Sequence, residues 1–149
     1  MTTNVLAYLE RSAQEYPNKI ALLDETSRFS YLETLTLSKK IGTALSHLLP
    51  PKHPVGIYME KEALTLCAFF GAAYAGCFYC ALNTELPATR LGQIASVLEP
   101  NVIITTKKLL PTAQEIFPGF CLVTVDALTA TDIDQPRLDA LRRLPVHLL

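Results

Sequence analysis

The sequence lacks the short motifs by which proteins most often hold a phosphate, a dinucleotide, zinc or an acyl group. It contains no G-x-x-x-x-G-K-[ST] loop, no G-x-G-x-x-G fingerprint, no H-E-x-x-H pair and no G-x-S-x-G elbow. Each of these patterns places glycine backbone, histidine nitrogens or a serine hydroxyl where a particular reaction needs them. The motif search therefore gives no direct support to any of these common enzyme classes.

Charge is also scarce. Only 18% of the residues are charged and 50% are hydrophobic, and 13 Lys and Arg against 14 Asp and Glu leave a net charge of -1. This composition excludes a disordered tail, and 149 residues are enough to enclose one hydrophobic core. The basic residues form only scattered pairs, namely Lys39-Lys40, Lys107-Lys108 and Arg142-Arg143. We interpret them as solvated faces and expect no nucleic-acid partner.

The cysteines indicate a reducing compartment. There are four of them, Cys67, Cys77, Cys80 and Cys121. Because Met1-Thr2-Thr3-Asn4 has no basic segment followed by an apolar run, we expect a cytoplasmic chain with free thiols. Cys77 and Cys80 have C-x-x-C spacing, but an apolar run surrounds them and no second Cys/His pair lies nearby. This context favours buried structural thiols over a metal or redox site.

Residues 63–83 carry no charged side chain and are long enough to cross a bilayer. Gly71 and Gly76 interrupt the run, and the aromatic pair Phe78-Tyr79 follows them. The flanking charges show no one-sided excess of Lys or Arg. We therefore predict a buried helix, a break and a buried strand with no membrane partner, and keep a membrane-spanning helix as the alternative.

The N-terminal part predicts a helix, a hairpin and a second helix. Residues 4–16 have apolar side chains at helical spacing, and 20–30 contain two short runs joined by turn residues. Ser30 followed by Glu33 is a capping box, which predicts the start of a long helix. Pro50-Pro51 ends this helix, because proline cannot donate the helical hydrogen bond.

The remaining sequence alternates between strand and helix patterns. Strands are predicted at 55–59, 78–82, 102–105 and 121–125, and helices at 63–75, 87–98, 109–117 and 136–143. Pro87 is expected as a first helical residue. Such alternation predicts an α/β fold, in which a parallel β-sheet built from βαβ units has helices on both faces. The N-terminal helix and the small hairpin precede this sheet.

Few side chains stand out as chemical candidates. His47, His53 and His147 lie far apart without partners at ligand spacing, so we interpret them as surface or loop residues. Asp132-Ile133-Asp134 lacks the further oxygen ligands that calcium needs. The aromatic side chains of Tyr74, Phe78 and Tyr79 could stack on a base or an acyl chain, but a position in the core is the favoured interpretation.

Four segments in a fixed order resemble a known family. They are Phe29-Ser30-Tyr31-Leu32-Glu33, Ala75-Gly76-Cys77-Phe78-Tyr79-Cys80-Ala81-Leu82-Asn83, Leu86-Pro87-Ala88-Thr89-Arg90-Leu91 and Val102-Ile103-Ile104-Thr105. Together they are similar to the N-terminal portion of the adenylate-forming (AMP-binding) ligases. This superfamily includes acyl-CoA ligases, D-alanine carrier-protein ligases and nonribosomal peptide synthetase adenylation domains. Thr34 and Ala81 depart from the leucine and proline usual in the first two motifs.

The resemblance implies an ATP- and Mg-dependent enzyme that activates a carboxylate substrate as an acyl-adenylate and transfers it to a thiol, that of CoA or a carrier protein. In the family, the phosphate loop, the nucleotide-binding residues and the lid lysine would all follow Leu149. We therefore expect 1–149 to be a truncated N-terminal subdomain, inactive by itself, with 127–149 as a linker toward the missing phosphate loop. No catalytic, cofactor-binding or metal-binding residue is carried over to this chain. Its partner would be the remainder of the same polypeptide.

Two other hypotheses stay open. The chain could be a non-catalytic binding or assembly module that keeps the scaffold, or a small flavodoxin-like nucleotide-binding protein. An incomplete parallel sheet should also leave apolar surface exposed, so we expect self-association into a homo-oligomer. The second motif favours an amino acid over a fatty acid as the substrate of the complete ligase.

Overall fold

The computed structural model describes residues 5–144, so the predicted surface histidine His147 lies outside the described residues. The helices are α1 Val5–Glu15, α2 Tyr31–Leu48, α3 Ala63–Tyr74, α4 Ala88–Leu98, α5 Leu110–Ile116, α6 Val125–Thr129 and α7 Gln135–Arg142. The strands are β1 Ile20–Leu23, β2 Arg28–Ser30, β3 Pro54–Tyr58, β4 Phe78–Ala81, β5 Val102–Thr105 and β6 Leu122–Thr124. The predicted elements are all present within a few residues of their expected bounds.

The predicted hairpin and capping box are confirmed. Strands β1 and β2 pair antiparallel, and α2 begins directly after β2. The Ser30 hydroxyl accepts from the Glu33 backbone N–H at 3.1 Å, and the Glu33 carboxylate accepts from the Ser30 N–H at 2.9 Å. Helix α4 begins one residue later than predicted, at Ala88. Pro87 is its N-cap in extended conformation rather than its first helical residue.

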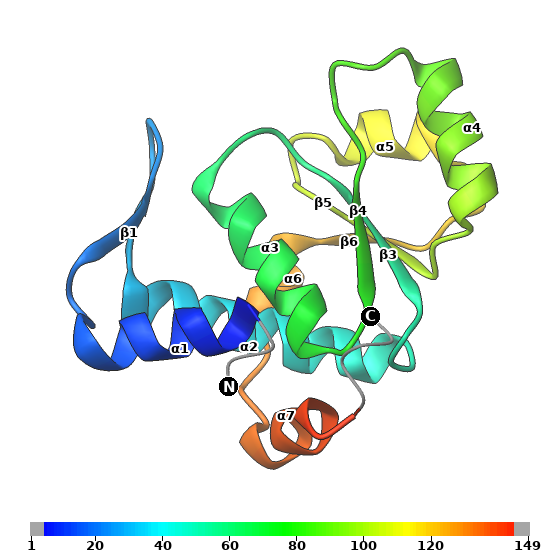
Figure 1. Ribbon diagram of the computed structural model, residues 1–149. Coiled ribbons are helices and arrows are strands. Elements are labelled where there is room, and N and C mark those ends of the chain that lie inside the picture. Colours follow the sequence, from blue (N-terminus) through cyan, green and yellow to red (C-terminus); the bar gives the residue numbers. More distant parts are fainter. Residues whose placement is uncertain (1–4, 145–149) are drawn as a thin grey trace.

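The main sheet has four parallel strands in the order β4-β3-β5-β6. The chain leaves β3 through α3 to reach β4 on one side, then returns through α4 to β5 on the other side. Figure 1 shows α1, α2, α3, α6 and α7 on one side of the sheet and α4 with α5 on the other. This arrangement confirms the predicted α/β fold with helices on both faces.

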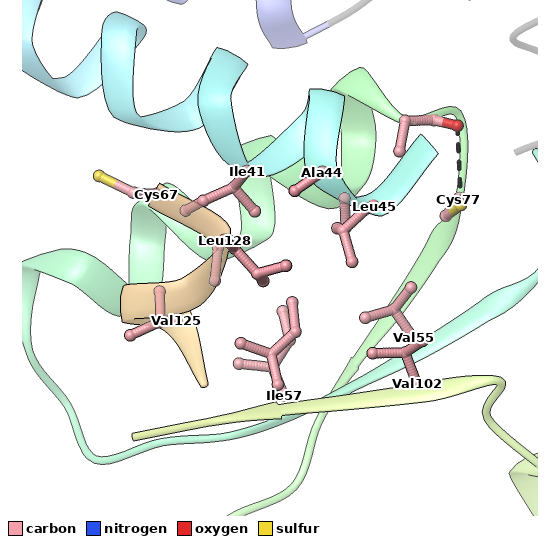
Figure 2. Packing of buried hydrophobic residues seen from close by; sticks show 14 of the residues in the cluster. Ile41, Ala44, Leu45, Val55, Ile57, Cys67, Cys77, Val102, Val125 and Leu128 are labelled. Carbon is pink, nitrogen blue, oxygen red and sulfur yellow. Dashed lines mark hydrogen bonds between the residues drawn. The ribbon is translucent and has the colours of Figure 1, made fainter. Parts of the chain in front are cut away.

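Two apolar clusters hold these layers together. The larger joins α2, α3 and α6 to one face of the sheet, where Ile41 and Leu45 face Val55, Ile57 and Val102 across the interface (Figure 2). The smaller joins α4 and α5 to the opposite face around Tyr58, Ile103 and Phe117. Because β3 and β5 contribute to both clusters, these central strands are buried on both faces, which is why their sequences read as continuous apolar runs.

Helices α2 and α3 pack unusually closely at two glycines. A Cβ added at Gly71 would lie 2.3 Å from Cγ2 of Ile41, and one added at Gly42 would lie 2.5 Å from Cβ of Tyr74. Atoms cannot approach so closely, so both positions require glycine for the helices to meet. Both glycines lie outside the four segments that resemble the family.

The motif glycine Gly76 has a different role. It has a φ of 73° in the turn between α3 and β4, and its N–H donates to the Ala73 carbonyl at 3.0 Å. Only glycine adopts this left-handed conformation without steric cost, so it ends the helix and redirects the chain. We expect Gly76→Ala to lower the free energy of unfolding by about 1 kcal/mol, measured by urea denaturation. An unchanged midpoint would contradict this role.

Strand β4 departs from the prediction. Phe78 is 41% exposed and Tyr79 is 49% exposed, so the interpretation of both as core residues is wrong, whereas Tyr74 is buried as expected. The cause is the order of the strands: β4 lies at the border of the sheet, where no further strand from residues 5–144 covers it. The predicted burial of the thiols likewise holds for Cys77, but Cys80 on this strand is only half-buried.

The C-terminal part of the described chain packs on the N-terminal helices. Asp134 is the N-cap of α7 and accepts from the Arg137 backbone N–H at 3.1 Å. Arg142 pairs with Glu10 of α1, and Tyr74 of α3 donates to the same carboxylate. These contacts fix α7 to the helical layer, while the assignment of 127–149 to a linker stays a prediction. Over the described residues, no helix combines the length and hydropathy needed to cross a membrane.

Candidate functional site

A crevice of about 840 Å³ opens at the carboxyl ends of β3 and β4. Its walls come from the loops that follow β3 and β4, from α3 and from the start of α5; the polar residues among them are Tyr58, Glu60, Lys61, Thr65, Asn83, Thr84, Glu85 and Thr112. After β3 the chain passes through α3 on one face of the sheet. After the neighbouring strand β5 it passes through α5 on the other face. Open α/β sheets bind ligands at such a switch point, because the diverging loops leave a gap there.

The loop after β3 is fixed from two sides. The Asp24 carboxylate accepts from the Ala63 backbone N–H at 2.7 Å and so caps α3 from the β1–β2 turn. This bond, with those from Thr26 and Ser27, holds the pKa of Asp24 below its ordinary value. The Thr65 hydroxyl donates to the Glu60 carbonyl at 2.6 Å. One rim of the crevice is therefore preorganised by the fold.

The charges around the crevice are mostly negative. Burial, with the nearby carboxylates of Asp24 and Glu60, raises the pKa of Glu62 in the loop that follows β3. Burial and the Glu60 charge likewise raise the pKa of the Tyr58 phenol. Lys61 lies among the lining residues together with Glu60 and Glu85, and Lys108 forms an exposed ion pair with Glu60 at 3.4 Å. An anionic ligand would meet little compensating charge here.

These residues do not fit a magnesium–nucleotide complex by themselves. A triphosphate needs several cations or a cradle of backbone N–H groups, and magnesium needs carboxylate ligands beside it. The crevice offers one lysine against two glutamates, and the described residues contain no group of three or more His, Cys, Asp or Glu positioned to hold a metal ion. The crevice lining therefore does not by itself support a catalytic step on a nucleotide.

The side chains considered from the sequence are not brought together. His47 is exposed on α2, His53 contacts the Pro51 carbonyl at 3.0 Å, and Asp134 serves as a helix cap. Three crevice residues, Ala81, Leu82 and Asn83, also belong to the second of the family-like segments. The Asn83 amide oxygen accepts from the Glu85 N–H. The sequence analysis did not identify this crevice. The available signal was that the predicted parallel strands 55–59 and 78–82 end at Met59 and Leu82, which places the loops that follow them at one edge of the sheet.

Comparison with known proteins agrees with this architecture. The family model described as "AMP-binding enzyme" matches residues 9–143. A D-alanine--D-alanyl carrier protein ligase of Staphylococcus haemolyticus is 27% identical over 105 residues, which cover 70% of this chain and 21% of that ligase. Nonribosomal peptide synthetase kk1B of Curvularia clavata is 26% identical over 131 residues, covering 87% of this chain and 1% of the synthetase.

Solved structures share the fold. The N-terminal domain of FACL13 from Mycobacterium tuberculosis superposes with a TM-score of 0.79 at 23% identity, covering 91% of this chain and 38% of that one. VinN superposes with a TM-score of 0.77 at 18% identity, covering 94% and 36%. The chain thus spans only a minor part of these relatives. Since the family model matches most of its length, the chain belongs to the AMP-binding enzyme family, that of the adenylate-forming ligases.

Proposed function

We propose that this chain is the N-terminal scaffold segment of an ATP-dependent carboxylate-activating ligase and forms no acyl-adenylate by itself. The observation that carries the proposal is the family match over residues 9–143, combined with a crevice whose lining has little positive charge. The segment would supply a rigid parallel sheet and one wall of a ligand site. Catalysis of this type depends on charged groups that stabilise phosphoryl charge, which other parts of such a ligase would supply.

The names of the relatives support a substrate class for the complete enzyme. D-alanine carrier-protein ligases and a nonribosomal peptide synthetase are among them, and a Probable acyl-activating enzyme 21 of Arabidopsis thaliana is 25% identical over 111 residues. We therefore favour an amino acid as the carboxylate of the complete enzyme and the thiol of a carrier protein as the acceptor.

Calorimetry and pyrophosphate exchange test the proposal. Titration of the 149-residue chain with MgATP should show no binding heat, and exchange of labelled pyrophosphate into ATP with D-alanine should stay at background. The complete S. haemolyticus ligase serves as the positive control for the assay. Micromolar affinity for MgATP together with acyl-adenylate formation by these residues alone would overturn the proposal.

A non-catalytic assembly module is the second candidate, because the structure leaves an uncharged sheet border exposed. Sequencing the gene past codon 149 separates the two. An in-frame continuation into a glycine-rich loop supports the ligase segment, whereas a stop codon at that point supports the module.

A further inference from the structure

The outer border of β4 is an unpaired strand edge. The Phe78 N–H donates to the His53 carbonyl at 3.1 Å, and the Leu82 N–H donates to the Ile57 carbonyl at 2.8 Å. In a parallel ladder this alternation turns the N–H and C=O groups of Tyr79 and Ala81 away from β3. Within residues 5–144, no other strand pairs with this edge.

This edge lacks the usual protection against pairing. Sheet borders commonly carry a lysine, a proline or a bulge that prevents another strand from adding to them. Strand β4 reads Phe-Tyr-Cys-Ala, without charge or proline, and its ladder to β3 has an unbroken register. The exposed Tyr79 ring is held in place against Phe69, with ring centroids 5.0 Å apart. The edge is thus both available and preorganised.

The edge is also complementary to itself in one orientation. In an antiparallel pair related by a two-fold axis at Cys80, Tyr79 of one copy lies opposite Ala81 of the other. Both residues point their backbone groups outward, so each pair exchanges two hydrogen bonds. The two Cys80 residues then face each other as a non-hydrogen-bonded pair, in which Cα atoms lie about 4.5 Å apart.

Charges at the two ends of β4 select this orientation. Lys52 is exposed at the amino end, where its N–H donates to the Gly76 carbonyl at 2.7 Å, and Glu85 is exposed beyond the carboxyl end. Antiparallel pairing brings the Lys52 end of each copy beside the Glu85 end of the other. Parallel pairing would instead bring like charges together, which is unfavourable.

We propose that β4 is a homodimerisation edge, at which a second copy of this chain adds antiparallel with Cys80 at the two-fold axis. This inference does not depend on the proposed ligase role, because it rests on strand order, exposure and charge alone. The β4 edge is then the surface responsible for the self-association expected from the sequence.

Oxidative cross-linking tests the position of the axis. Disulfides need Cα separations of about 4.4–6.8 Å, which the facing Cys80 pair satisfies. Diamide should join two copies: each Cys80 thiol gives up one proton and one electron, and diamide is reduced to its hydrazine. The dimer band on a non-reducing gel should persist in Cys121→Ser and disappear in Cys80→Ser. A band that depends on the exposed Cys121 instead, or no band, would overturn the proposal.

An equilibrium measurement tests the edge without cysteine chemistry. Sedimentation equilibrium should show a concentration-dependent dimer, and Ala81→Lys should raise its dissociation constant by at least about tenfold by placing a lysine from each copy at the edge. Val97→Lys, on α4 at a side chain 87% exposed, is the matched control and should leave dimerisation unchanged. A monomeric wild type, or Ala81→Lys that dimerises as well as wild type, would exclude this interface.

Reversal of the end charges tests the orientation. Lys52→Glu should weaken the dimer, and adding Glu85→Lys to the same chain should restore it, because each pair then has opposite charges again. Far-ultraviolet circular dichroism would verify that every variant keeps its fold. A double variant that dimerises no better than Lys52→Glu would contradict antiparallel pairing.

Discussion

Replacing Gly71 with alanine is expected to destabilise the chain by about 3 kcal/mol, at the upper end of the usual cost of overpacking a core. The added Cβ would lie 2.3 Å from Cγ2 and 2.6 Å from Cβ of Ile41, a branched side chain with no exposed surface. Rotation of the Ile41 side chain does not move its Cβ atom, so the clash can be relieved only if α2 and α3 separate. Urea denaturation followed by circular dichroism measures the loss.

Gly92→Ala provides a matched control within the same protein. Gly92 also lies inside a helix, α4, but the nearest atom to an added Cβ is the Ile116 carbonyl oxygen at 3.8 Å. Alanine there should stabilise the chain by about 0.5–1 kcal/mol, because glycine has the larger backbone entropy in the unfolded state. Equal effects at both positions would show that helix propensity, rather than close packing of α2 and α3, determines the result.

The elements of this fold were predictable because their sequence signals are local. Ser30 and Glu33 are three residues apart, and their capping box marks the start of α2 as expected. Likewise, every side chain of β5, Val102–Thr105, is buried, as the continuous apolar run indicated. Local patterns of this kind do not depend on which strand lies beside which.

Strand order explains what the sequence did not reveal. Phe78 and Tyr79 are as apolar as residues of a central strand, and only the position of β4 at the border leaves them exposed. The crevice is assembled from loops near residues 60, 83 and 109, which no spacing rule links. Gly42 and Gly71 show the same limitation, since their importance depends on how α2 crosses α3.

A contact between distant parts of the sequence joins three helices through Glu10. Its carboxylate accepts from the Arg142 guanidinium at 3.0 and 3.1 Å and from the Tyr74 hydroxyl at 2.7 Å, across sequence separations of 132 and 64 residues. Burial raises the pKa of Glu10, but the hydrogen bonds from Arg142 and Tyr74 outweigh it and hold the pKa below its ordinary value. The ionised carboxylate is therefore the form that stabilises the packing of α1 and α7 against α3.

Glu10→Gln should therefore lower the free energy of unfolding by about 1.5 kcal/mol near neutral pH, since hydrogen bonds to charged groups contribute about 1.5–3 kcal/mol and partial exposure reduces this. Because the folded-state pKa is depressed, the contribution is complete above the ordinary glutamate pKa of about 4.3 and is lost as the pH falls through the folded value. The difference between wild type and variant should stay constant from about pH 5.5 to 8 and close below about pH 4.

Glu15→Gln on the same helix isolates this effect. Glu15 pairs with Arg11 at 3.6 Å, but both side chains are more than half exposed, at 53% and 72%. Water screens such a pair, so this variant should change stability by less than about 0.5 kcal/mol at any pH. Denaturation midpoints of the two variants, measured across the pH range, test whether Glu10 contributes more to stability than an exposed carboxylate does. If Glu10→Gln tracked Glu15→Gln, the carboxylate would contribute no more than a surface charge, and the packing of α7 would depend on apolar contacts such as that of the buried Leu138.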